Sequence, residues 1–213
     1  MKKFFTLIVA TLMASSMMAQ MHGALTFAGP SSINVQTQNT GNDCDTVRFE
    51  MASMSAGNIT LPVMQGMAAI PSFTIENVAF SMGENHVISI AEQTFASKVT
   101  VNGEEKNIEG SSISGSYNMA DNSLTLKAVF KYGAMPFDLT YEVKAYYVKP
   151  VASAITVNVG GTFIYGNDGV TYNVRKYIDG DVEKVDVEIP TYTLDNTVMG
   201  NLTLGTYTVK GLT

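Results

Sequence analysis

The chain has 213 residues, of which 46% are hydrophobic and 15% are charged, which excludes an intrinsically disordered acidic tail and allows one or two globular domains. The formal net charge is −6, and lysine and arginine are scattered singly, so we expect no nucleic-acid partner. The single cysteine, Cys44, excludes an intrachain disulfide and any metal site built from several cysteines.

Residues 1–19 have the three-part layout of a secretory signal peptide: Lys2 and Lys3, then an apolar run, then small residues. We expect cleavage after Ala19, with Ser16 as a second possible position. A buried N-terminal helix is the alternative interpretation of this segment. Without the two lysines, 11 basic and 19 acidic residues remain, a net charge near −8.

The rest of the chain contains no stretch that approaches 18 apolar residues, so the sequence predicts no membrane span. No cysteine follows the apolar run at a cleavage point, which argues against a lipid anchor. We therefore expect an exported protein that resides in the periplasm, on the outer surface or in the extracellular medium.

Alternation of apolar and polar residues with a period of two dominates the mature chain, and this pattern is typical of half-buried strands. The clearest strands are expected at 45–51, 93–101, 123–131, 137–147, 155–165, 170–175 and 185–189. Weaker strands are expected at 24–27, 33–37, 72–80, 86–90, 112–119 and 202–210. The alternation predicts an inward face that includes Leu124, Leu126, Phe130, Leu139, Tyr141 and Val143.

Turn signals separate these runs at Asn102-Gly103, Asp168-Gly169 and Asp179-Gly180. Many short strands joined by short turns favour an all-β antiparallel barrel or sandwich. Pro150 marks the expected boundary between two strand-rich blocks.

The second block echoes the first, which suggests an internal repeat. The segment 47–51 parallels 185–189, and 70–75 parallels 204–209. The second copy stops at Thr213, so we expect 153–213 to form about four strands that cannot close a barrel. Its partly exposed face should include Val157, Val159, Val187 and Tyr207, with 206–212 at a sheet edge.

Three arrangements would cover that open sheet: packing on the first barrel, self-association with another chain, or continuation into a longer protein. The positions that match between the two copies favour continuation into a longer protein.

Four segments carry a resemblance to a known family: 70–80 (IPSFTIENVAF), 133–150 (GAMPFDLTYEVKAYYVKP), 156–165 (TVNVGGTFIY) and 206–213 (TYTVKGLT). With the lysine-led signal, they resemble the calycin-like β-barrel domain of exported proteins from gut-dwelling Gram-negative bacteria. The resemblance implies a lipocalin-like closed antiparallel barrel. The expected organisation is a signal peptide at 1–19, a calycin-like barrel at 20–149 and an incomplete second repeat at 150–213.

The residues that usually carry chemistry are few and dispersed. His22 and His86 lie far apart in the sequence, which disfavours a histidine metal site. Cys44 stands between Asp43 and Asp45, whose charges disfavour a thiolate nucleophile. Both aspartates are interpreted as solvated loop residues. The acidic run Asp179, Asp181 and Glu183 is too short for a calcium loop and is interpreted as a hairpin turn. We expect no catalytic residues, no metal and no cofactor.

Five methionines are concentrated in one part of the chain: Met51, Met54, Met64, Met67 and Met82. Flexible thioethers suit the lining of an adaptable cavity for a small apolar molecule, and they also serve as ordinary core residues. Tyr146 is expected on the outer face of its strand, beside Tyr147.

These features predict an exported, non-enzymatic β-barrel binding module, with a small hydrophobic ligand as its expected partner. The alternative is a structural or cell-surface interaction protein whose barrels are filled by their own side chains, because an eight-stranded barrel is only just wide enough for one small ligand.

Overall fold

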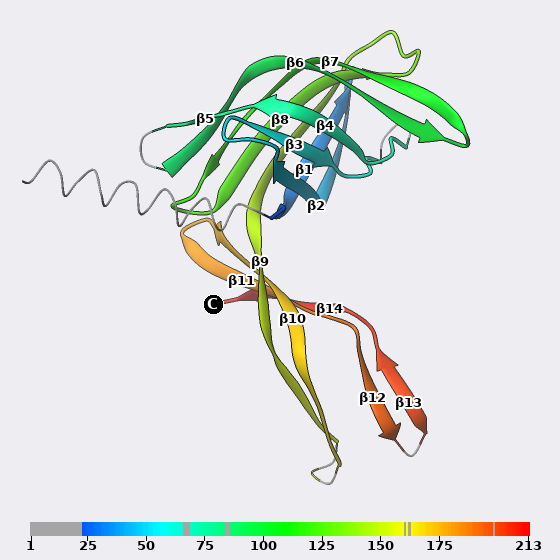
Figure 1. Cartoon of the computed structure of the whole chain (residues 1–213), viewed down its shortest axis with the longest axis vertical. Coiled ribbons are helices and arrows are strands. Elements are labelled where there is room, and N and C mark those ends of the chain that lie inside the picture. Colours follow the sequence, from blue (N-terminus) through cyan, green and yellow to red (C-terminus); the bar gives the residue numbers. More distant parts are fainter. Residues whose placement is uncertain (1–22, 66–68, 84–85, 160, 162, 198) are drawn as a thin grey trace, which may run out of the picture. The chain divides into compact units, whose positions relative to one another are not determined.

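The structure is a computed structural model that describes residues 23–65, 69–83, 86–159, 161, 163–197 and 199–213. The proposed signal peptide, His22 and Met67 lie outside the described residues. The chain divides into two compact units, one up to Ala145 and one from Tyr146 to Thr213, and Figure 1 labels their strands.

The first unit is built from antiparallel strands in the order β4-β3-β2-β1-β9-β8-β7-β6-β5. The strands are β1 (Leu25–Val35), β2 (Gln38–Met51), β3 (Ala56–Leu61), β4 (Phe73–Ala79), β5 (Ser81–Met82), β6 (Val87–Val101), β7 (Glu104–Asn118), β8 (Ser123–Tyr132) and the start of β9 (Leu139–Val159). The expected turn at Asn102-Gly103 joins β6 to β7, and both residues have positive φ angles, of 53° and 83°.

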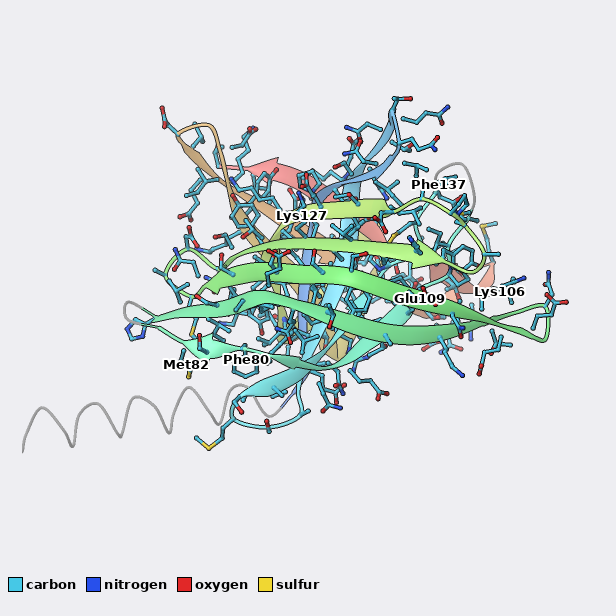
Figure 2. The ribbon with its side chains drawn as sticks, turned by 90° about the horizontal axis from the view of Figure 1, so that it is seen from above. Phe80, Met82, Lys106, Glu109, Lys127 and Phe137 are labelled. Carbon is cyan, nitrogen blue, oxygen red and sulfur yellow. The ribbon has the colours of Figure 1, made fainter. Side chains whose placement is uncertain are left out.

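The predicted inward face is confirmed. All six residues are buried: Leu124, Leu126, Phe130, Leu139, Tyr141 and Val143. Lys127, one position out of phase, is exposed (Figure 2). It pairs with Glu142 at 2.8 Å. A shift by one residue would bury this ion pair, so the alternation determines the register of β8 and β9.

The core of the first unit is dense with aromatic rings. Phe130 lies between Phe73 and Phe95, with ring centroids at 5.4 and 6.4 Å. Phe27 meets Tyr117 edge-on at 4.9 Å, in a geometry that aromatic pairs favour. Side chains from strands throughout the sheet therefore fill its interior.

The seam between β4 and β6 is bridged by side chains. The Gln93 amide accepts a hydrogen bond from the Ala79 N–H at 2.9 Å and donates one to the Ala79 carbonyl at 2.8 Å. The Ser97 hydroxyl donates to the Thr74 carbonyl at 2.7 Å. No backbone ladder joins β4 to β6 among the described residues, so the observed architecture is a large antiparallel sheet with a side-chain-bridged seam.

Several sequence-based strand predictions were wrong in detail. No strand was predicted at β3, whose alternation is short and begins at Ala56 and Gly57. The expected strand at 155–165 is instead the end of β9 and the start of β10, which form a hairpin. The expected turn at Asp168-Gly169 is a bulge inside β10, where the register shifts between Asn167 and Val170.

Pro150 does not end a strand, because β9 runs through it and pairs with Asn173 at that position. In the second unit, β9 pairs with β10 on one side, and proline is tolerated at a sheet edge because its missing N–H then removes no ladder bond.

The second unit is an open sheet in the order β9-β10-β11-β14, with a separate hairpin of β12 and β13. Its strands are the end of β9, β10 (Phe163–Asp179), β11 (Val182–Ile189), β12 (Tyr192–Thr197), β13 (Gly200–Leu204) and β14 (Tyr207–Leu212). The expected hairpin turn at Asp179-Gly180 is confirmed. The expected edge position of 206–212 is also confirmed, since β14 pairs with β11 and Tyr207 is 51% exposed.

The repeat alignment equates 70–75 with 204–209, and the two segments pair differently. In the first unit β4 pairs with β3, which separates it from β2. In the second unit β14 pairs directly with β11, the counterpart of β2 in the alignment. The strand pairing of 70–75 therefore differs from that of 204–209, and the internal repeat stays a prediction.

Tyr146, expected on the outer face of its strand, has the same phase as exposed Glu142 and Lys144, but it is itself buried. Tyr146 is 7% exposed, and its ring lies 6.2 Å from that of Tyr177 in the same unit. Ala145 and Tyr146 are consecutive and both buried, so the alternation of β9 breaks where the strand passes from one unit to the next.

Candidate functional site

The methionines expected to line a cavity occupy different environments. Met64 is buried at 3% exposure and forms an isolated bridge with Ile70. Met54 and Met82 are 76% and 51% exposed, and Met51 is half-buried. Of the four that the structure describes, Met64 lines a cavity that also contains a buried carboxylate.

That carboxylate belongs to Asp45, which is 7% exposed. One oxygen, Oδ2, accepts hydrogen bonds from the Ser31 hydroxyl at 2.5 Å and the Tyr141 hydroxyl at 3.2 Å. The other, Oδ1, accepts one from the Asn42 amide at 2.5 Å. Three neutral donors from β1, β2 and β9 therefore converge on one buried acidic group.

The interpretation of Asp45 as a solvated loop residue was wrong. The residue lies within β2, and it shares its face with Val47 and Phe49, which are both buried. The two-residue period that predicted Val47 and Phe49 as inward extends to position 45, so the signal was present in the sequence. Asp43 also lies within β2, and it is exposed, as expected.

A bulge between β1 and β2 brings the donors together. Gly29 pairs with Asp45, but the next pair joins Ser31 to Asn42, so Pro30 stands outside the ladder. Proline cannot donate a ladder hydrogen bond and is common at such bulges. The shift places Ser31 and Asn42 on either side of the Asp45 carboxylate.

Gly29 allows the backbone of β1 to approach β9 closely. A Cβ atom at Gly29 would lie 2.2 Å from the Lys144 carbonyl oxygen, a distance that real Cβ atoms do not reach. Glycine at this position therefore lets β9 come near enough for its Tyr141 to reach Asp45 on β2.

Tyr141 remains a hydrogen-bond donor over the ordinary pH range. Burial first, and then the negative charge of Asp45, raise the pKa of the Tyr141 hydroxyl well above its usual value near 10. The phenol is therefore neutral, and its proton is available to the carboxylate.

The cavity beside Asp45 has a volume of about 220 Å³. Its lining combines polar groups with a few apolar ones: Ser31, Ile33, Thr40, Gly41, Asn42, Asp45, Met64, Gln65 and Tyr141. It belongs entirely to the first unit. It has the features of a small binding site, which are a concave shape and a few convergent polar groups.

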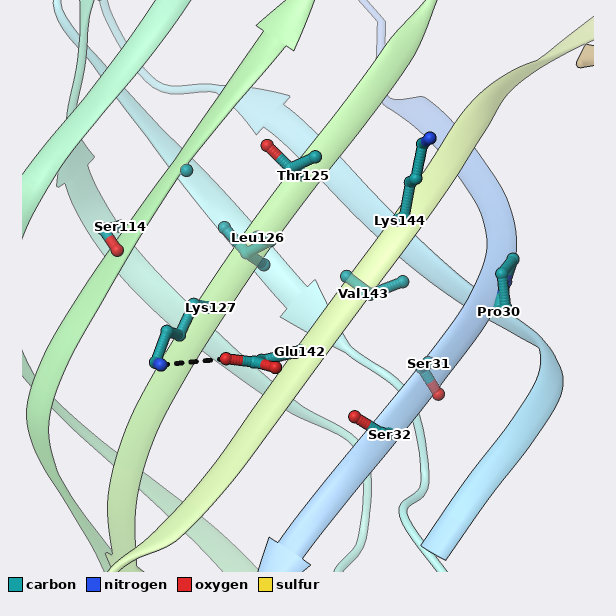
Figure 3. Close-up of a pocket in the computed structure, with 11 residues that line it drawn as sticks. Pro30, Ser31, Ser32, Ser114, Thr125, Leu126, Lys127, Glu142, Val143 and Lys144 are labelled. Atoms are coloured by element: carbon teal, nitrogen blue, oxygen red, sulfur yellow. Dashed lines mark ion pairs between the residues drawn. The ribbon is translucent and has the colours of Figure 1, made fainter. Parts of the chain in front are cut away.

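Two further depressions lie on the surface of the first unit. One of about 510 Å³ runs over β1, β7, β8 and β9 and carries the Lys127–Glu142 ion pair (Figure 3). The other, about 910 Å³, follows the seam of β4 and β6 and continues onto β7. Both are wider and more open than the Asp45 cavity.

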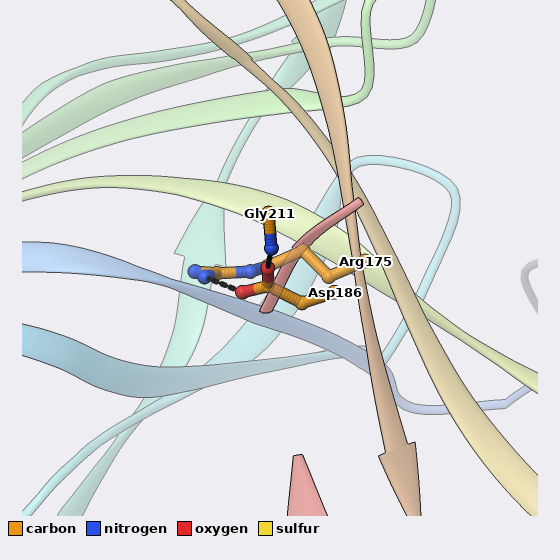
Figure 4. A network of polar contacts seen from close by, with 3 residues as sticks. All are labelled: Arg175, Asp186 and Gly211. Atoms are coloured by element: carbon orange, nitrogen blue, oxygen red, sulfur yellow. Dashed lines mark hydrogen bonds and ion pairs between the residues drawn. The ribbon is translucent and has the colours of Figure 1, made fainter. Parts of the chain in front are cut away.

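A buried ion pair anchors the edge strand of the second unit. Arg175 on β10 contacts Asp186 on β11 at 2.5 Å, with side chains 15% and 7% exposed. The other oxygen of Asp186 accepts a hydrogen bond from the Gly211 N–H of β14 at 2.8 Å (Figure 4). The Arg175 guanidinium also lies 4.8 Å from the centre of the Tyr177 ring.

The ionised state of Asp186 is favoured in the folded chain. Burial alone would raise the pKa of its carboxyl, but hydrogen bonds from Arg175 and from the Gly211 amide outweigh burial and lower the pKa below its usual value. This ion pair was not predicted from the sequence. It could have been inferred from the hairpin register, since Arg175 and Asp186 are directly opposite each other.

Apart from Asp45, the described histidine, cysteine and acidic residues singled out in the sequence are either exposed or paired with lysines at the surface. His86 and Cys44 are both exposed. Asp179 pairs with Lys184 at 2.5 Å and Glu183 with Lys176 at 3.4 Å, around the β10–β11 turn. Within the described part of the chain, no group of three or more His, Cys, Asp or Glu residues is placed to hold a metal ion.

Comparisons of the chain with models of protein families, with curated proteins and with solved structures find no match. Among the residues that the structure describes, no helix is long and apolar enough to cross a membrane.

Proposed function

We propose that this chain is an exported, non-enzymatic interaction protein whose first domain, 20–149, is a calycin-like barrel filled by its own side chains. The observation that carries this proposal is the packing of the first unit. Its largest fully buried side chains include Tyr141, Phe27 and Phe130, which come from β9, β1 and β8. These side chains fill the space between their strands, and the cavity that Tyr141 lines, about 220 Å³, is smaller than the pockets of about 300–1,000 Å³ that hold drug-sized ligands.

Closure of the barrel is part of the proposal. The Gln93 and Ser97 side chains replace ladder hydrogen bonds along the β4–β6 seam. In a Gln93→Ala variant the Ala79 amide should exchange its hydrogen faster, whereas Thr60→Ala, which removes a hydroxyl contact between β3 and β4, should leave it unchanged. Equal exchange in both variants would refute a role for Gln93 in closing the seam.

The filled interior favours an interaction protein over a carrier of a small apolar molecule. Native mass spectrometry of protein secreted by its host, together with titration of a fluorescent fatty-acid probe, tests this choice. We expect no co-purified lipid and no saturable increase in fluorescence. A stoichiometric lipid would instead support the small-ligand function.

The second unit supplies the proposed contact surface. Large apolar side chains are exposed along its strands and turns: Ile164, Ile178, Val182, Met199, Leu202, Tyr207, Val209 and Leu212. The edge of β14 that faces away from β11 also offers backbone hydrogen-bonding groups for another strand. We propose that β14 pairs with the β14 strand of a second copy, because identical edges match across a two-fold axis.

Size-exclusion chromatography with light scattering tests this self-association. Val209→Lys places like charges across the proposed two-fold axis and should shift the chain toward monomer. Val151→Lys on β9 is a matched control, because Val151 and Val209 are each 37% exposed. A monomeric wild-type chain, or equal effects of the two substitutions, would refute pairing through β14.

Export is tested by the N-terminus of the mature protein. Expression in a Gram-negative host, followed by fractionation and intact-mass measurement, should locate the chain outside the cytoplasm, with cleavage after Ala19 or Ser16. A cytoplasmic chain that retains Met1 or Lys2 would contradict the proposal.

A further inference from the structure

We propose that the Asp45 cavity of the first unit binds the ammonium group of a small primary amine, with the Asp45 carboxylate as its charge partner. This inference goes beyond the interaction role proposed above, whose contact surface lies on the second unit, whereas the Asp45 cavity belongs to the first unit. It rests on the hydrogen bonding of Asp45, on the ion pairs of the described residues and on the lining of the cavity.

The Asp45 side chain acts as an acceptor in each of its side-chain hydrogen bonds. Ser31, Asn42 and Tyr141 all donate to it, so both oxygens act as acceptors. A carboxylate offers about four acceptor sites, and three are used by these donors. Capacity for one more donor therefore remains on a group that lines the cavity.

Asp45 differs from the other buried acid of the chain in its charge environment. Asp186 is matched by the Arg175 guanidinium. Among the ion pairs formed by the described residues, none includes Asp45, although it is equally shielded from solvent. A buried charge is costly unless an opposite charge or several donors compensate it, so an incoming cation would interact strongly here.

The lining of the cavity selects a slim, protonated amine. The lining includes Thr40 and Gln65, whose side chains carry oxygen acceptors for the remaining N–H groups. Ile33 and Met64 provide apolar surface for methylene groups. The volume of about 220 Å³ is below the range of about 300–1,000 Å³ of drug-sized pockets. A short alkylammonium ion therefore fits the chemistry better than a bulky or aromatic cation.

A purely structural role for Asp45 is the competing explanation, because its hydrogen bonds tie β1, β2 and β9 together. The two explanations differ in their response to an added cation. We would titrate the isotope-labelled full chain with n-butylammonium chloride, and separately with 1-butanol, and follow amide resonances by NMR. Butylammonium should cause saturable shifts at Gly41, Asn42, Asp45 and Gln65, and butanol should not.

Asp45→Asn removes the charge at nearly constant size and should weaken butylammonium binding at least tenfold. Asp43→Asn is the matched control, since it removes the same charge from an exposed position of the same strand and should change the affinity little. The absence of saturable shifts, equal responses to amine and alcohol, or equal affinities of the two variants would overturn the proposal.

A third variant decides the question if Asp45→Asn fails to fold. Gly41 lines the cavity, and an added Cβ there would meet only the Ser31 carbonyl oxygen, at 3.8 Å. Gly41→Val therefore adds bulk to the lining while it retains the carboxylate and its donors. It should weaken butylammonium binding severalfold, and an unchanged affinity would overturn the proposal.

Discussion

Tyr141 on β9 donates its hydroxyl hydrogen to the carboxylate of Asp45 on β2, 96 residues earlier in the chain, across 3.2 Å. Both side chains are buried. This bond connects the last strand of the first unit to its N-terminal hairpin. Because it ends on a charged acceptor, it should contribute more to stability than a bond between two neutral groups.

Tyr141→Phe should therefore destabilise the chain by about 1–3 kcal/mol, because it leaves a buried carboxylate with one donor fewer. Urea denaturation followed by tyrosine fluorescence or circular dichroism measures the change. Tyr132→Phe is a control of the same chemistry, on a half-buried tyrosine near the end of β8. A loss of stability no larger than that of the control would contradict the assigned role of Tyr141.

The stabilising contribution of Tyr141 should be lost in alkali. The folded state raises the pKa of this hydroxyl above the unfolded value near 10, so its contribution is fully present below about pH 10. As pH rises further, the unfolded chain loses the proton first, and stability should fall by up to about 1.4 kcal/mol per pH unit. Subtracting the pH profile of Tyr141→Phe removes the effects of other groups, and a flat difference above pH 10 would refute this prediction.

Much of the first unit could be predicted from alternation alone. The period of two placed Leu126 inside and Lys127 outside because water and core lie on opposite faces of each strand. The same rule did not predict the burial of Tyr146, because the ring packs near Tyr177 of β10, a partner that local alternation does not reveal. It also failed at 155–165, since the apolar alternation continues from β9 into β10, two strands that pair with each other.

The candidate site was less predictable than the fold. Asp45 was interpreted from its polar neighbours, although its phase with Val47 indicated a buried position. Its partners Ser31 and Tyr141 come from strands that a single sequence does not pair. The methionine group showed the converse difficulty: proximity along the chain gave Met54 and Met64 a common interpretation, but one is exposed and the other is buried.

Asp186→Asn should destabilise the second unit by about 3 kcal/mol, because it leaves the Arg175 guanidinium buried without its charge partner. Since the folded pKa of Asp186 is lowered, its stabilisation is present above the unfolded pKa near 3.9 and is lost as pH falls through the folded value. The stability difference between wild type and variant should therefore shrink below about pH 4. A difference independent of pH would show that ionisation of Asp186 does not stabilise the unit.

The same variant should loosen β14 locally. Asp186 accepts a hydrogen bond from the Gly211 N–H, and Gly211 has a positive φ of 66° at an irregularity of the β11–β14 ladder. Hydrogen exchange at the Gly211 amide should accelerate in Asp186→Asn by more than at Val174, which pairs with Val187 of β11 and with Lys149 of β9. Uniform acceleration throughout the unit would indicate global unfolding rather than release of the edge strand.

Gly29→Ala tests whether close approach of β1 and β9 positions the Asp45 site. The new methyl group would overlap the Lys144 carbonyl oxygen, which is backbone and cannot rotate away, so the strands must separate at a cost of about 1–3 kcal/mol. Separation should lengthen the Tyr141–Asp45 hydrogen bond and shift the Tyr141 ring resonances. Gly41→Ala is the control on the paired strand β2, because its methyl group would meet only the Ser31 carbonyl oxygen at 3.8 Å. The expected order of stability is wild type and Gly41→Ala close together, with Gly29→Ala well below. Equal stability of the two alanine variants would show that β1 and β9 can adjust without strain, and that Gly29 is not what brings Tyr141 to Asp45.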